Sequence, residues 1–100
     1  MKRYEIWEAE VRFEDEPTIK KRPVMIWNDV AFVMAYKLTG TDRGDNNEEF
    51  RIEFWKEAGL SKPTSIRISK LLKLEHVSIK RKIGELDMRD RLRFELRIVG

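Results

Sequence analysis

The 100-residue chain has no cysteine, which excludes disulfides, thiolate metal sites and cysteine nucleophiles. Its single histidine, His76, excludes a nuclease that works with two histidines and argues against a zinc site. No apolar run reaches membrane-spanning length, and the charged N-terminus lacks the apolar core of a signal peptide. We therefore expect a cytoplasmic protein that needs no membrane, no metal ion and no other cofactor.

The composition is that of one small globular domain. Apolar residues make up 41% of the chain and charged residues 39%. A chain of this length holds a single core, so we expect one domain over residues 1–100. The formal net charge of +3 permits binding to a polyanion without requiring it, so the position of the cations matters more than their number.

Alternating apolar and polar side chains predict several short strands. The expected strands are residues 4–13, 23–27, 30–38, 50–55 and 64–71. The third of them is nearly all apolar, as in a strand buried on both faces, and the glycine-containing segment 39–47 after it is the clearest loop. Short strands separated by turns favour a small, strongly curved antiparallel sheet or barrel.

The C-terminal segment fits two structures. Residues 91–98 alternate strictly, which is typical of a strand. In contrast, Asp87 is a candidate helix N-cap with Asp90 in the first turn. A helix would gather its apolar side chains into one stripe, made of Met88, Leu92, Leu96 and Val99. The local pattern alone leaves both alternatives open.

A basic run stands before the second expected strand. Lys20, Lys21 and Arg22 precede Pro23, and proline is confined to the first residue of a strand or to an edge because it cannot donate to the ladder. Arg22 is therefore expected where a loop becomes rigid sheet, and a fixed guanidinium there could bind a phosphate. On these residues alone, a solvated charge run at the start of an ordinary strand is the simpler interpretation.

Four segments follow one another in a fixed order along the chain. They are RPVMIWND at 22–29, YKLTG at 36–40, AGLSKPTSIRIS at 58–69 and KRKIGELD at 80–87. This order resembles that of the MazF/PemK (Kid) toxins of bacterial toxin–antitoxin systems. No single segment is specific, but their order and spacing together extend the resemblance over residues 4–96. The resemblance implies a mainly β, SH3-like small barrel with a C-terminal helix, assembled as a homodimer. It favours a helix over residues 87–98.

The resemblance also implies an activity. Proteins of this family cleave single-stranded RNA without a metal ion, leave a cyclic phosphate and a 5′-hydroxyl, and are blocked by a cognate antitoxin. Arg22 and Thr39 match family catalytic positions, and Arg67 matches an arginine of the fifth strand. Arg22 suits charge stabilisation at a phosphorane and Thr39 can donate to a phosphoryl oxygen, whereas an arginine stays protonated and is no base.

One departure concerns the proton acceptor. Ser69 stands where the Kid branch has an aspartate, and Lys70 where a glutamine often follows. Serine accepts no proton at neutral pH unless another base activates it. The remaining base candidates lie in the first connection, although such an acidic triplet is usually a solvated turn; they are Glu14, Asp15 and Glu16. Asp42 and Asp45 are weaker candidates.

Further side chains are candidates for binding RNA. They are Lys20, Lys21, Thr41, Arg43, Trp55, Ser69 and Lys70. Trp55 falls on the polar face of its expected strand and suits base stacking or a dimer contact, whereas Trp7 and Trp27 are expected in the core. The basic run 80–82 fits RNA or an acidic antitoxin tail, but solvation explains it as well. His76 is expected to be an ordinary surface residue.

Three functions remain open at this point. The first is a toxin endoribonuclease. The second is the same barrel without catalysis, binding RNA or a protein partner, and Ser69 supports it. The third is a general basic nucleic-acid-binding module, against which the glutamates of the first strand argue. We place the endoribonuclease first.

Overall fold

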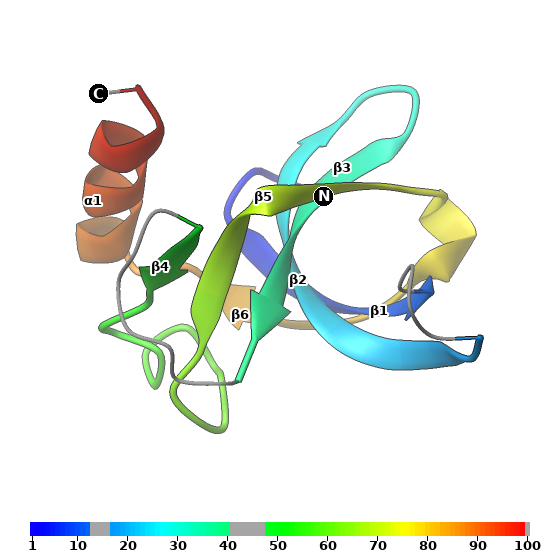
Figure 1. Cartoon of the computed structure of the whole chain (residues 1–100), viewed down its shortest axis with the longest axis horizontal. Helices are drawn as coiled ribbons and strands as arrows, with labels where there is room; N and C mark the ends of the chain where they lie inside the picture. Colours follow the sequence, from blue (N-terminus) through cyan, green and yellow to red (C-terminus); the bar gives the residue numbers. More distant parts are fainter. Residues whose placement is uncertain (13–16, 41–47, 100) are drawn as a thin grey trace.

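The computed structural model describes residues 1–12, 17–40 and 48–99. Its described part is an antiparallel six-stranded sheet and a C-terminal helix (Figure 1). The elements are β1 (Glu5–Arg12), β2 (Ile19–Asp29), β3 (Val33–Thr39), β4 (Glu49–Arg51), β5 (Ser65–Leu74), the 3₁₀ turn η1 (His76–Ser78), β6 (Ile79–Glu85) and α1 (Met88–Val99). The sheet order is β4-β5-β3-β2-β1-β6. The predicted mainly β fold with a C-terminal helix is confirmed, as a strongly curved sheet that does not close.

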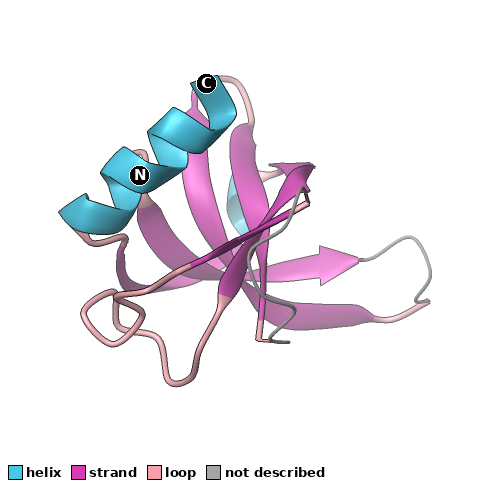
Figure 2. Cartoon of the chain, turned by 60° about the vertical axis from the view of Figure 1, so that its left-hand side comes forward, coloured by secondary structure: helices cyan, strands magenta, loops and turns pink. Residues whose placement is uncertain are grey.

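The long strand β2 gives the sheet its shape. It pairs with β1 from Ile19 to Met25, whereas its pairing with β3 begins only at Val24. Pro23 directly precedes that point and has no N–H to donate. The first half of β2 therefore extends beyond β3 together with β1, and Figure 2 shows these two strands reaching away from the rest of the sheet.

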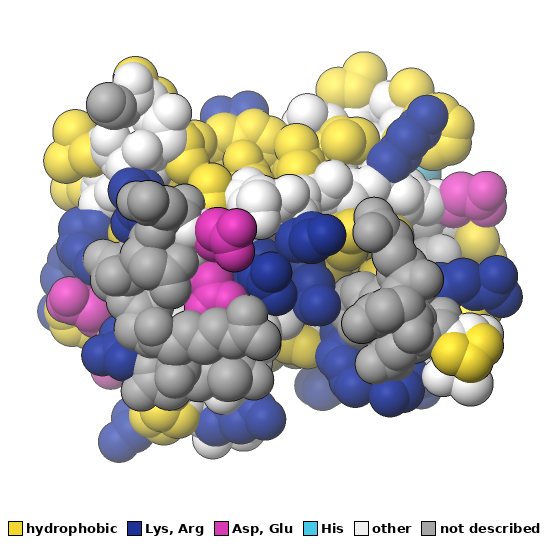
Figure 3. Space-filling view, in the orientation of Figure 1, with side chains coloured by type: hydrophobic (Ala, Val, Ile, Leu, Met, Phe, Trp, Pro, Cys, Tyr) yellow, Lys and Arg dark blue, Asp and Glu magenta, His cyan; other side chains and the backbone are white. Residues whose placement is uncertain are grey.

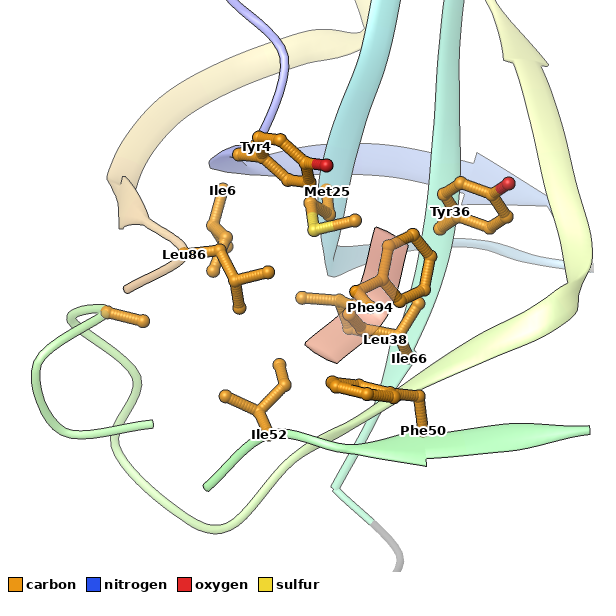
Figure 4. Close-up of a cluster of buried hydrophobic side chains, with 11 residues drawn as sticks. Tyr4, Ile6, Met25, Tyr36, Leu38, Phe50, Ile52, Ile66, Leu86 and Phe94 are labelled. Carbon is orange, nitrogen blue, oxygen red and sulfur yellow. The ribbon is translucent and has the colours of Figure 1, made fainter. Parts of the chain in front are cut away.

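The two faces of the sheet are buried in two separate clusters. The larger one fills the space between the sheet, α1 and the chain around Ile52, and Figure 4 shows its side chains converging there. Its members are Tyr4, Ile6, Met25, Tyr36, Leu38, Phe50, Ile52, Ala58, Ile66, Leu86 and Phe94. The smaller one, on the opposite face, holds Ala9, Val11, Val24, Ile26, Val33 and Ala35. Strands β2 and β3 supply both clusters, which explains the apolar runs at 24–27 and 33–36 within them.

Aromatic side chains join the sheet to the helix. Trp27 makes edge-to-face contacts with Tyr4, Tyr36 and Phe94, at ring-centroid distances of 5.8, 5.5 and 5.9 Å. Phe94 is fully buried and is also 5.4 Å from the ring of Phe50. Such pairs add about 1 kcal/mol each beyond the burial of their area. Trp27 thus packs against the core, as expected.

Helix α1 forms because its ends and its buried face are satisfied. Asp87 accepts a hydrogen bond from the Arg89 N–H at 2.9 Å, which is the expected N-cap. The Arg89 side chain and N–H together lower the pKa of Asp87 to about 2. Asp90 is completely buried and accepts hydrogen bonds from the N–H groups of Glu53 and Phe54 at 3.2 and 2.8 Å. The helix expected over 87–98 is confirmed.

The expected start of the second strand was wrong. Strand β2 begins at Ile19 and not at Pro23, so Arg22 lies within the strand, paired with Ala9, and not where a loop becomes sheet.

Two further expectations about strands were wrong. The fourth strand is short, Glu49–Arg51, and residues 53–59 form turns instead, because Asp90 of α1 binds two of their N–H groups. Strand β6 was not expected at all, since its side chains are charged and mostly exposed. Among the described residues, no helix is both long and apolar enough to cross a membrane.

The basic run of β6 is matched by glutamates of β1. Lys80 lies 3.1 Å from Glu10 and Lys82 lies 3.1 Å from Glu5. Between them, Arg81 lies opposite Glu8 at the longer distance of 3.9 Å. These cross-strand pairs explain why the first strand carries so many acidic residues, since opposite charges across neighbouring strands stabilise their pairing.

Candidate active site

A pocket of about 740 Å³ opens where β2 leaves β3. Its described walls come from β1, β2, β3, β6 and the segment after the turns. The lining residues are Glu8, Lys21, Arg22, Pro23, Lys37, Leu38, Thr39, Gly40, Gly59, Leu60, Ser61, Lys62, Thr64, Arg81 and Ile83. Figure 3 shows Lys and Arg side chains gathered over the middle and lower part of one face.

The charge of this pocket has one dominant sign. The described lining residues include five cations and one carboxylate, Glu8. The cations are Lys21, Arg22, Lys37, Lys62 and Arg81. A concave surface lined by charges of one sign concentrates ligands of the opposite sign, so the pocket suits a polyanion. Within residues 1–12, 17–40 and 48–99, no group of three or more His, Asp or Glu side chains suited to a metal ion is found.

Arg22 and Thr39 lie in the same part of the pocket. The β2–β3 register pairs Val24 with Lys37 and Met25 with Tyr36. Arg22 and Thr39 lie beyond the last of these pairs, where β2 leaves β3, and both line the pocket. Arg22 is exposed, and its Nη1 donates to the backbone carbonyl of Lys21 at 3.1 Å. Arg22 and Thr39 thus belong to one basic pocket.

Close backbone packing holds the opposite wall. Gly59 has φ +88°, and a Cβ there would lie 2.5 Å from the Ile83 carbonyl oxygen. A Cβ on Gly84 would lie 2.1 Å from the Ala58 carbonyl oxygen. Only glycine permits this approach, so the turns 53–59 are fixed directly against β6. They carry Leu60 and the segment after it into the pocket wall.

Lys62 is positioned by the loop that follows this contact. Its side chain passes over Gly40, where an added Cβ would meet Lys62 Cε at 2.3 Å. The hydroxyl of Thr64 donates to the Lys62 carbonyl at 2.9 Å. The Lys62 side chain therefore crosses the chain directly after Thr39, and its charge adds to that of Arg22 in one pocket.

The fifth strand is arranged differently from expectation. Arg67 does not line this pocket; its Nε lies 3.3 Å from Oε1 of Glu49, a carboxylate that is only 1% exposed. Glu49 and Arg67 are partners in the β4–β5 pairing, at the point where the β3–β5 pairing shifts register. Ser69 is exposed and Lys70 half-buried, and neither lines the pocket. The structure therefore does not bring these three residues to Arg22, and their roles stay predictions.

The remaining predicted residues are distributed as follows. Lys21 lines the pocket, whereas Lys20 is exposed on β2 next to it. Trp55 packs against the larger cluster and lies under Lys56 Nζ, 5.4 Å from the ring centroid, away from the pocket lining. The predicted residues Glu14, Asp15, Glu16, Thr41, Asp42, Arg43 and Asp45 lie outside the described residues.

His76 belongs to another part of the molecule. It is exposed in η1 and forms a hydrogen bond with the Asp29 carboxylate, which lowers the pKa of Asp29. Neither residue lines the pocket. His76 is thus the surface residue that was expected.

Three charged lining residues were not candidates from the sequence. Lys37 stands two residues before Thr39 in a quoted motif and could have been found from strand alternation. Lys62 sits in another quoted segment, but nothing local shows that it crosses Gly40. Glu8 becomes a site residue only through the register of β1 with β2 and β6, which also brings Arg81, of the basic run 80–82, into the lining.

Comparison with known proteins shows the fold of this chain. No protein-family model matches its sequence, and no curated protein matches it. Among solved structures, it is similar to the Mycobacterium tuberculosis toxin MazF-mt6, with a TM-score of 0.74 and 22% sequence identity. The match covers 94% of this chain and 91% of that one. The chain therefore has a MazF-like toxin fold.

Proposed function

Starting from this MazF-like fold and its basic pocket, we propose that the protein is a metal-independent endoribonuclease, a toxin that cleaves single-stranded RNA. The observation that carries the proposal is that Arg22 and Thr39 line one pocket together with four further cations. We place this function in a single domain, residues 1–100, in the cytoplasm. No cofactor takes part in the proposed reaction.

The pocket residues have different roles in the proposed cleavage. The RNA 2′-hydroxyl attacks its own phosphodiester, and the phosphorane that forms carries more negative charge than the ground state. Arg22 holds two of its oxygens, because guanidinium binds such anions at fixed angles. Thr39 donates a hydrogen bond to a phosphoryl oxygen. Lys21 and Lys62 hold the flanking backbone, where charge rather than base identity decides binding.

The outer binding residues extend this path beyond the pocket. We keep Lys20, Thr41, Arg43, Trp55, Ser69 and Lys70 as RNA contacts, and Arg67 as a catalytic assistant. Arg67 would reach RNA only by leaving Glu49, so its share of the rate is expected to be smaller than that of Arg22.

The partners proposed are a second copy of the chain and an antitoxin protein. Helix α1 exposes one apolar stripe while Phe94 faces the core. Its members and exposed fractions are Met88 62%, Leu92 61%, Leu96 74% and Val99 85%. Two copies of one stripe can pack against each other about a two-fold axis, which suits a homodimer. The antitoxin would cover the basic pocket.

The dimer is tested by a charge in the stripe. Leu96→Glu should shift the protein from dimer to monomer in sedimentation, because each interface would bury two facing carboxylates. Leu71→Glu is the matched control, since Leu71 is also an exposed leucine, 41%, but lies on β5. A monomeric wild type, or dissociation by both variants alike, contradicts the proposed surface.

A second function is favoured by one observation. Arg67 is paired with Glu49 outside the pocket, and Ser69 is exposed. The protein could therefore bind RNA or a protein partner on the same fold without cleaving. This alternative predicts salt-sensitive RNA binding, no cleavage product and no growth arrest on expression.

The cleavage assay decides between the two functions. Wild-type protein is incubated in EDTA with unstructured RNA, and with the same RNA carrying 2′-O-methyl groups, which must stay intact. Arg22→Ala should lower the cleavage rate about 10³-fold, as loss of a transition-state donor does. Arg97→Ala, on α1 and away from the pocket lining, is the matched control and should cleave normally. Intact RNA after long incubation with folded dimer contradicts the endoribonuclease.

A further inference from the structure

The proposed reaction needs a group that removes the proton of the 2′-hydroxyl. Lysine and arginine side chains are protonated at neutral pH and cannot do this. Ser69, which replaces the aspartate of the resembling toxins, is exposed and does not line the pocket. Among the described lining residues, Glu8 is the one carboxylate. The pocket therefore contains its own candidate for the proton acceptor.

The register of the sheet brings Glu8 close to Arg22. Glu8 pairs with Pro23, and the next residue, Ala9, pairs with Arg22. Side chains alternate along a strand, so Glu8 and Arg22 leave the β1–β2 ladder on opposite faces. Both nevertheless line the pocket, which opens where β2 leaves β3.

The pairing of β6 beside Glu8 is irregular, whereas β1 itself is regular. The β1–β6 pairing shifts register on both sides of the Trp7–Glu8 dipeptide, and the extra residues, Ile83 and Lys80, belong to β6. Such bulges bend the strand that carries them and are over-represented beside active sites. The β1–β2 pairing runs through Glu8 without a shift, so Glu8 is held on regular sheet opposite a bent part of β6.

Glu8 also differs from the other glutamates of β1 in its ion pair. Glu5 and Glu10 each lie 3.1 Å from a lysine of β6. The Glu8 carboxylate lies 3.9 Å from Arg81 Nη2, which is beyond hydrogen-bond distance. Its side chain is 30% exposed, so it is accessible from the pocket. Glu8 is the glutamate of the three that lines the pocket.

We propose that Glu8 is the general base of this protein. This inference rests on the endoribonuclease function proposed above. The 2′-hydroxyl gives its proton to the Glu8 carboxylate as the bond from its oxygen to phosphorus forms. The bond from phosphorus to the 5′-oxygen breaks, and that oxygen takes a proton from water. The products are a 2′,3′-cyclic phosphate and a 5′-hydroxyl, and Glu8 returns its proton to solvent.

The test separates catalysis from binding. Glu8→Gln keeps the shape of the side chain and removes its basicity, so kcat on unstructured RNA in EDTA should fall about 10²- to 10⁴-fold. The Kd for 2′-O-methyl RNA, measured by fluorescence anisotropy, should stay the same or decrease, because a negative charge leaves a basic pocket. Glu8→Asp keeps a carboxylate and should recover part of the rate. Thermal melting of each variant shows that it is folded.

The matched control is Glu10→Gln, two residues further along β1, where Glu10 pairs with Lys80 and does not line the pocket. It should cleave at the wild-type rate. Full activity of folded Glu8→Gln overturns the proposal, above all if a Gln substitution at Glu14, Asp15 or Glu16 abolishes cleavage instead. A wild type that never cleaves overturns the proposed function, and the role of Glu8 falls with it; a cleaving wild type with an active Glu8→Gln overturns the role of Glu8 alone.

Discussion

Charged side chains are arranged in opposite ways in two regions of the molecule, one around helix α1 and one in the pocket. In α1, the buried Asp90 carboxylate accepts hydrogen bonds from two backbone N–H groups and, at 2.8 Å, from Arg93. At the pocket end, five cations face one carboxylate. The first arrangement is neutralised and contributes to stability, whereas the second concentrates one sign of charge at an accessible surface. The difference indicates where structure is maintained and where a polyanion is bound.

The largest effect is expected on stability, from removing the Asp90 carboxylate. Asp90→Ala leaves the N–H groups of Glu53 and Phe54 and the Arg93 guanidinium without their buried acceptor. Removing one partner of such a group costs about 3 kcal/mol, or roughly 12 °C or more in Tm for a domain of this size. Thermal denaturation measures it, and Asp87→Ala, which removes only the N-cap of the same helix, should cost less, about 1 kcal/mol. Unchanged stability would show that the turns 53–59 do not depend on α1.

A smaller effect is expected at the pocket, and it should appear in activity. Thr39→Val keeps the side-chain shape but removes the hydroxyl that is proposed to donate to a phosphoryl oxygen. We expect roughly a tenfold loss of kcat, or about 1.4 kcal/mol. Thr18→Val is the control, because Thr18 is an exposed threonine before β2 that does not line the pocket. A loss of Tm without loss of kcat would make Thr39 a structural residue.

The smallest effect is expected from Glu5, the first residue of β1. Burial raises the pKa of its carboxyl, but hydrogen bonds from the Lys2 N–H, the Trp7 indole and Lys82 outweigh this and lower the pKa to about 2. The ordinary pKa is 4.5, so Glu5 stabilises the fold above that pH, and this contribution is lost as the pH falls toward 2.

Glu5→Gln should therefore lower stability at pH 7 by about 1 kcal/mol, allowing for solvent screening. The difference from wild type should shrink between pH 5 and pH 2. Urea denaturation at several pH values measures it, and Glu8→Gln provides the comparison with the loosest of the three pairs. A pH-independent difference would mean that the shape of Glu5, not its charge, matters.

Most of the fold could be predicted from the sequence, because the alternation of apolar and polar residues along a strand indicates which of its faces is buried. Strands β1, β2, β3 and β5 and the cap at Asp87 all follow from local patterns. Strand β6 could not be seen, because its charged side chains match glutamates of β1 and that match appears only in the register. The turns 53–59 depend on Asp90, which lies more than thirty residues away along the chain.

The candidate site was predictable only in part. The motifs pointed to Arg22 and Thr39, which line one pocket, and their catalytic role stays a prediction. Glu8 looked like an ordinary polar residue on the outer face of a strand, because its position beside Pro23 depends on pairing between segments. Lys62 lines the pocket because glycines allow the backbone of the turns 53–59 to pack against β6, and the segment that carries Lys62 follows these turns.

The most direct test of the account is the chemistry of the cut itself. After the cleavage site on one RNA is mapped in EDTA, the same RNA is made with a single 2′-deoxy nucleotide on the 5′ side of that site. The account predicts a 2′,3′-cyclic phosphate and a 5′-hydroxyl on the all-ribose RNA, and no cut at the deoxy position. Continued cleavage there would contradict attack by the 2′-hydroxyl, and with it the proposed roles of Arg22, Thr39 and Glu8.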